Sequence, residues 1–122
     1  MSALWLRGGV AAALSFVVLQ IAALLVAGGS FDYPLDDVYI HLSMSEQIAA
    51  GGYGVNPGEF ASASSSILYP LLLAPFAGYD WHILVPLAWN ALGVVLSGGL
   101  FGAIVTEAQL PVRQARLIVL IA

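Results

Sequence analysis

The chain of 122 residues is 61% hydrophobic and 8% charged, with a net charge of −4 and a mean hydropathy of +0.95. Soluble domains are roughly 45–50% apolar and 25% charged, so the composition predicts a membrane protein. Three arginines without a lysine cannot form the cationic surface that nucleic acids require. The absence of cysteine excludes disulfides, thiol nucleophiles and cysteine-ligated metals.

Residues 1–27 contain the first predicted transmembrane helix. From Val10 to Ala27 no residue is charged, and only Ser15 and Gln20 are clearly polar. About 20 apolar residues span a bilayer. The alternative is a cleaved signal peptide, because residues 25–29 end in small side chains. A signal core usually has ~7–15 apolar residues, so the greater length favours an uncleaved anchor.

Residues 28–80 form a loop with six of the seven acidic residues and no arginine. The arginines are Arg7, Arg113 and Arg116, beyond the far ends of the two long apolar segments. Basic residues favour the cytoplasmic side. We therefore expect a cytoplasmic N-terminus and an extracytoplasmic loop.

Two helices lying on the membrane surface are predicted in this loop, over about residues 36–50 and 65–77. In the first, Asp36 or its neighbour is the N-cap and Gly51-Gly52 is the stop signal. The second is a short apolar run of a length typical of interfacial segments. Asn56-Pro57-Gly58 between them is a turn signal.

Asp37 and His41 are the candidate ligands for a divalent metal cation. They are four residues apart on the predicted helix, so they share a face and could offer two ligands. The alternative for this pair is a local hydrogen bond on a solvated face.

Three serines, Ser64, Ser65 and Ser66, precede the short apolar run. Their hydroxyls and the free amides of a helix start could hold a phosphate. The alternative is a flexible serine linker that also caps the second helix.

Residues 81–106 are predicted to form the second transmembrane helix, with Trp81 and His82 at the interface. Gly98 and Gly102, together with Gly93 and Ser97, provide a small-residue face for close helix packing. A third apolar segment starts at about residue 112, and residue 122 is the last. We expect the chain to be the N-terminal part of a longer polytopic protein.

The order of these features resembles the first extracytoplasmic loop of the GT-C glycosyltransferases, in particular bacterial mannosyl- and arabinosyltransferase-like proteins. The motifs are Asp36-Asp-Val-Tyr-Ile-His41, Gly54-Val-Asn-Pro-Gly-Glu59, the serine cluster and Leu71-Leu-Leu-Ala-Pro75. They follow an anchor helix, and the resemblance covers about residues 1–105. Related motifs often carry an arginine soon after the tyrosine, where this chain has Ser43 and Met44.

The resemblance implies an all-α membrane enzyme of the bacterial inner membrane. Such enzymes transfer a sugar from a polyprenyl-phosphate donor to a hydroxyl of a glycan, lipid or protein acceptor on the extracytoplasmic face. The family's acid pair matches Asp36 and Asp37, and its first acid, the catalytic base, matches Asp36. Tyr39, His41 and the three serines are the candidate substrate-binding residues. We expect the chain alone to be inactive, because the sugar pocket requires further parts.

The alternative from another class is a small non-catalytic membrane protein that pairs with partner helices through its glycine-rich span. A transporter is disfavoured, because the uncharged parts of the two predicted spans, residues 10–27 and 83–105, contain no ionisable residue where a transporter would carry one.

Overall fold

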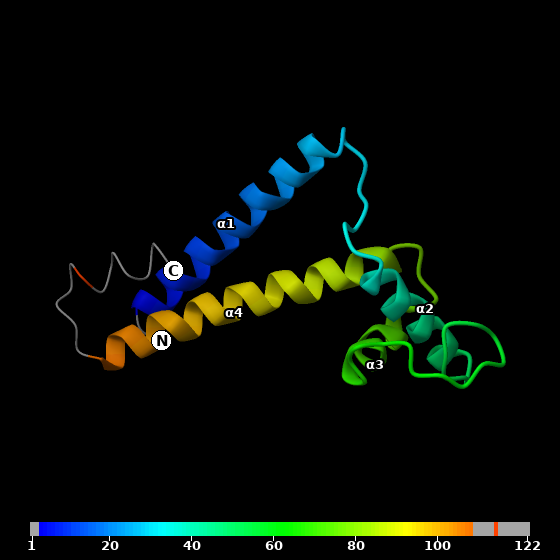
Figure 1. The fold of residues 1–122 in the computed structure, drawn as a ribbon. Coiled ribbons are helices and arrows are strands. Elements are labelled where there is room, and N and C mark those ends of the chain that lie inside the picture. Colours follow the sequence, from blue (N-terminus) through cyan, green and yellow to red (C-terminus); the bar gives the residue numbers. More distant parts are fainter. Residues whose placement is uncertain (1–2, 109–113, 115–122) are drawn as a thin grey trace. The chain divides into compact units, whose positions relative to one another are not determined.

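The computed structural model describes residues 3–108 and 114, and each regular element within them is a helix. The chain divides into two compact units (Figure 1). One consists of Met1–Phe31 and Trp89–Ala122, and the other of Asp32–Ala88. The predicted all-helical class is confirmed for these residues. The expected third apolar segment, with Arg113 and Arg116, lies outside the described residues except for Gln114.

Helix α1 spans Ala3–Val26 and is long and apolar enough to cross a membrane. Large apolar side chains are exposed along it, among them Leu6, Leu14, Leu19 and Val26. An exposed apolar surface on all sides is typical of a membrane span, and α1 is a candidate for one by its length and composition. The helix ends in a Schellman motif, in which Gly28 donates to the Leu25 carbonyl and Gly29 to the Leu24 carbonyl. The small residues at positions 28 and 29 therefore have a structural role as a helix stop.

Helix α4 spans Val85–Glu107 and follows a 3₁₀ turn, η2, at His82–Leu84. Together they form a second segment long and apolar enough to cross a membrane. Pro86 is accommodated because the first turn of a helix does not need its N–H group. The two candidate spans are therefore close to the residues predicted for them.

In the first unit, α1 and α4 approach each other closely at glycine residues. A Cβ atom added at Gly98 would lie 2.6 Å from both the Ala12 Cβ and the Gly8 carbonyl oxygen. One added at Gly102 would overlap the Leu4 carbonyl oxygen, whereas one at Gly93 would meet nothing within 4 Å. Gly98 and Gly102 of the predicted small-residue face are thus in close contact with α1 of the same chain, whereas Gly93 is not.

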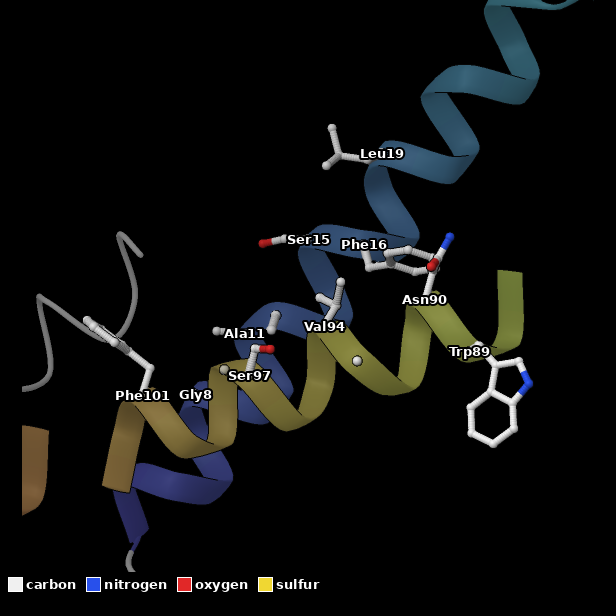
Figure 2. A pocket seen from close by; sticks show the side chains of 13 residues that line it. Gly8, Ala11, Ser15, Phe16, Leu19, Trp89, Asn90, Val94, Ser97 and Phe101 are labelled. Carbon is white, nitrogen blue, oxygen red and sulfur yellow. The ribbon is translucent and has the colours of Figure 1, made fainter. Parts of the chain in front are cut away.

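A groove of about 760 Å³ lies between α1 and α4 (Figure 2). Its lining is mostly apolar, with Ser15, Asn90 and Ser97 as polar residues. It belongs entirely to the first unit.

In the second unit, helix α2 spans Asp37–Ala49 and packs against α3, at Leu68–Leu73. Gly51 has a φ of 84° and donates to the Ile48 carbonyl, and Gly52 donates to the Gln47 carbonyl. This Schellman motif confirms the predicted stop.

The second predicted loop helix is shorter than expected. After α3, the chain continues as a 3₁₀ turn, η1, at Ala74–Phe76. Pro75 lacks the N–H group that an α-helix would need at this position. The most deeply buried side chains of the unit are those of Met44, Ser45, Pro70, Leu73 and Pro86.

The loop between α2 and α3 contains the predicted turn. Glu59 N–H donates to the Asn56 carbonyl at 3.2 Å, and Gly58 has a φ of 78°. With proline at the second position and positive φ at the third, this is a type II turn. The Asn56 side-chain amide also donates to the Glu59 carboxylate at 2.7 Å.

Candidate functional site

The acid pair lies at the start of α2. Asp36 occupies the N-cap position and Asp37 is the first helical residue, and both are exposed. The side chain of Asp36 makes no capping hydrogen bond, although its carbonyl accepts the N–H of Ile40. Asp36 therefore has the position predicted from the sequence without the side-chain bond that usually explains an N-cap aspartate. Its carboxylate is accessible.

Two tyrosines lie beside the acid pair. The backbone N–H of Tyr33 donates to the Tyr39 hydroxyl oxygen at 3.1 Å, and their rings meet edge to face with centroids 5.9 Å apart. Tyr39, a predicted substrate-binding residue, therefore holds the segment that leads into α2.

Tyr33 also connects this segment to the start of α4. Its hydroxyl donates to the Ile83 carbonyl at 2.7 Å and accepts the N–H of Leu87 at 3.2 Å. Leu87 lies in the first turn of α4, where N–H groups have no partner within the helix. Burial raises the pKa of Tyr33, although the hydrogen bond from Leu87 lowers it.

His41 is buried and its Nδ1 atom lies 2.7 Å from the hydroxyl oxygen of Ser64. Its ring also meets the ring of Tyr69 edge to face, with centroids 5.0 Å apart. The hydroxyl of Tyr69 lies 3.5 Å from the Pro86 carbonyl, and burial raises the pKa of Tyr69. The structure thus brings together His41 and Ser64, two of the predicted site residues from separate segments.

The three predicted serines have different environments. The Ser64 hydroxyl donates to the Ser66 carbonyl at 2.6 Å and accepts the Ser66 N–H at 3.1 Å. The Ser66 hydroxyl accepts the N–H of Tyr69 in the first turn of α3 at 3.3 Å. Ser65 is exposed. The bonds of Ser64 and Ser66 hold the backbone of the loop and of the first turn of α3, as in the alternative of a linker that caps this helix.

A second histidine cluster was not predicted. His82 is buried, its Nε2 lies 3.1 Å from the Ser45 hydroxyl oxygen, and its Nδ1 lies 3.6 Å from the Glu46 carboxylate. The order Ser, His and Glu resembles that of a hydrolytic triad. However, Ser45 is fully buried and donates its proton to the Leu42 carbonyl at 2.6 Å. Ser45 therefore has a structural role and is not a nucleophile. The sequence predicts His82 at the membrane interface, and the structure shows it buried against Ser45.

Asp37 and His41 are not joined by a hydrogen bond or ion pair in the described part of the chain. No group of three or more His, Asp or Glu side chains that could hold a metal ion occurs within residues 3–108. The protein donors found there do not form a metal centre by themselves, so we derive no step through a metal.

The chain was compared with models of known protein families, with curated proteins and with solved structures, and none of them matches.

Proposed function

We propose that the chain is the N-terminal portion of a membrane glycosyltransferase of the GT-C type. It would transfer a sugar from a polyprenyl-phosphate donor to an acceptor hydroxyl on the extracytoplasmic face of a bacterial inner membrane. The observation that carries this proposal is the accessible acid pair at the start of α2, with Asp36 free of a capping bond. The motif order between residues 36 and 75 supports it.

In this mechanism Asp36 is the general base. Its carboxylate accepts the proton of the acceptor hydroxyl while the hydroxyl oxygen attacks the anomeric carbon of the sugar. The bond from that carbon to the phosphate oxygen breaks, and polyprenyl phosphate leaves with the electron pair. A single displacement of this kind inverts the anomeric centre.

The remaining predicted site residues belong to the same unit as this base. Asp37 follows it on α2, and Tyr39 fixes the backbone of Tyr33 before it. Ser65 offers an exposed hydroxyl for the donor phosphate. Ser64 and Ser66 act by holding the loop and the first turn of α3.

The membrane placement follows from the two candidate spans. With α1 and the His82–Glu107 segment crossing the bilayer, residues 28–80 lie on one side. We propose that this side is the extracytoplasmic space, because the arginines lie beyond the other ends of the two spans. The acid pair would then lie where lipid-linked sugar donors and extracytoplasmic acceptors meet.

A small non-catalytic protein that pairs with partner helices is the competing proposal. Its main support was the glycine-rich face of the second span. Within the first unit, Gly98 and Gly102 are already in close contact with α1, so this face does not require a partner protein. The acid pair has no role in that alternative.

The test is a transfer assay on membranes from cells that express the complete gene. A radiolabelled polyprenyl-phosphate sugar series and total extracytoplasmic glycan acceptors would be supplied. We expect labelled product that depends on the gene. Its absence with every donor, combined with co-purification of a stoichiometric membrane partner, would favour the non-catalytic alternative.

A further inference from the structure

The chain contains two histidines, and they are bonded in opposite ways. Both are buried, and each forms a hydrogen bond with a serine hydroxyl. His41 uses Nδ1 and His82 uses Nε2. A neutral imidazole carries one N–H group, so the serine bonds can decide which nitrogen is left with a lone pair.

At Ser64 the direction of the bond follows from the other two bonds of its hydroxyl. The hydroxyl has one proton, which it donates to the Ser66 carbonyl at 2.6 Å. Its oxygen already accepts the Ser66 N–H and can accept one more bond. The bond to His41 at 2.7 Å therefore requires an N–H group on Nδ1. In the neutral ring, Nε2 then carries the lone pair.

At Ser45 the same reasoning gives the opposite result. This hydroxyl donates its proton to the Leu42 carbonyl at 2.6 Å, so it accepts from Nε2 of His82. The other nitrogen, Nδ1, faces the Glu46 carboxylate at 3.6 Å. Both ring nitrogens of His82 thus face acceptor oxygens of the protein, and the carboxylate can pair with Nδ1 only when Nδ1 carries a proton.

His41 differs because its Nε2 has no protein partner among the described residues. Among these residues, a side-chain nitrogen that is fully buried and has no partner occurs at Nε1 of Trp89. Nε2 of His41 also has no partner, but it is not fully buried. This nitrogen is therefore accessible from outside the protein. The ring itself is fixed by Ser64 and by the edge-to-face contact with Tyr69.

We propose that His41, held by Ser64 with its proton on Nδ1, uses Nε2 to accept a hydrogen bond from a hydroxyl group of the acceptor substrate. This inference rests on the proposed function and names the substrate class, an alcohol, that His41 contacts. Asp37 lies one helical turn before His41 on α2. The histidine that carries the lone pair and the acid pair are therefore in neighbouring turns of the same helix. A fixed ring with an unpaired acceptor is preorganised for a hydroxyl donor.

The first experiment measures the tautomers directly in the 122-residue chain. With ¹⁵N-labelled histidine in lipid nanodiscs, two-bond nitrogen–proton correlation spectra distinguish protonated from unprotonated ring nitrogens. The variants His41→Gln and His82→Gln show which signals belong to which ring, because each variant lacks one of the two histidines. We expect Nδ1–H for His41 and Nε2–H for His82. Ser64→Ala should mix the tautomers of His41 alone, and Ser45→Ala those of His82 alone. A His41 ring protonated on Nε2 at neutral pH would overturn the proposal.

The second experiment measures the acceptor KM of the protein expressed from its complete gene. His41→Phe removes the acceptor atom, whereas His41→Gln keeps a polar group near the Nε2 position. One lost neutral hydrogen bond should raise KM by about 3- to 10-fold in His41→Phe, with a smaller change in His41→Gln. Ser45→Ala is the control, because it removes a serine–histidine bond elsewhere, and should leave KM unchanged. An unchanged KM in His41→Phe would overturn the role of His41, whereas no transfer by the wild type would overturn the proposed function.

Discussion

The hydroxyl of Tyr33 donates a hydrogen bond to the carbonyl oxygen of Ile83, fifty residues further along the chain, at a distance of 2.7 Å. The same hydroxyl accepts the N–H of Leu87 in the first turn of α4. One side chain thus caps the second candidate span and anchors the segment that carries the acid pair.

Tyr33→Phe should therefore destabilise the second unit. Two hydrogen bonds are lost, at about 0.5–1.5 kcal/mol each. Exchange of the Leu87 amide proton, followed by NMR, should become faster. The control is Tyr79→Phe, since Tyr79 is exposed and no hydrogen bond of its hydroxyl is found in the described residues. Unchanged protection of Leu87 in Tyr33→Phe would contradict this role.

The tyrosine pKa values predict a loss of stability at high pH. Burial raises the pKa of Tyr33 and of Tyr69 above the ordinary 10.0. Both groups then bind protons more tightly in the folded state, so their contribution is complete below pH 10.0 and is lost as the pH rises through the folded values. The free energy of unfolding should fall above that pH, and less so in the double variant with phenylalanine at both positions. A free energy of unfolding that does not change above pH 10.0 would contradict the burial of these two phenol groups.

The glycine contacts predict a difference between two alanine substitutions on α4. Gly102→Ala places a methyl group against the backbone of Leu4 and should weaken the packing of α1 on α4. Gly93→Ala meets nothing within 4 Å, so it should be neutral or stabilise the helix by up to about 1 kcal/mol. Thermal unfolding in a single detergent would compare them. Equal melting temperatures would show that the helices do not pack through Gly102.

The orientation of the loop can be tested by cysteine labelling, because the chain has no cysteine. Single cysteines at the exposed positions 57, 61 and 65 should react with an impermeant reagent in spheroplasts. A cysteine at exposed position 6, near the end of α1 that is predicted to be cytoplasmic, should react only after the membrane is opened. The reverse pattern would invert the proposed topology.

The local signals of the sequence predicted much of this structure. The glycine pair predicted the helix stop at Gly51-Gly52, and Asn56-Pro57-Gly58 predicted a turn, which the structure shows to have a positive φ at Gly58. The length of the two apolar segments predicted both candidate spans. Each of these features depends on neighbouring residues, so it can be recognised without knowing the fold.

The long-range contacts could not be predicted in this way. Hydrophobic periodicity over residues 35–49 predicts one stripe with Leu35 and Leu42 and another with His41 and Met44. The buried face combines His41, Leu42, Met44 and Ser45, and Leu35 is exposed. Which face is buried depends on where α3 and the start of α4 pack, and hydrophobic periodicity does not contain that information. The pairing of Ser45 with His82 across 37 residues has no local signal.

The most direct test of the proposed function is Asp36→Asn in the protein expressed from its complete gene, with Asp37→Asn as the neighbouring comparison. Asp36 is exposed and its side chain caps nothing, so expression, membrane insertion and thermal stability should match the wild type. Asparagine cannot accept the proton of the acceptor hydroxyl, and transfer from the polyprenyl-phosphate sugar should fall by at least about 10²-fold. Near-normal turnover by Asp36→Asn would contradict its role as the base, and a comparable loss in Asp37→Asn alone would assign that role to Asp37.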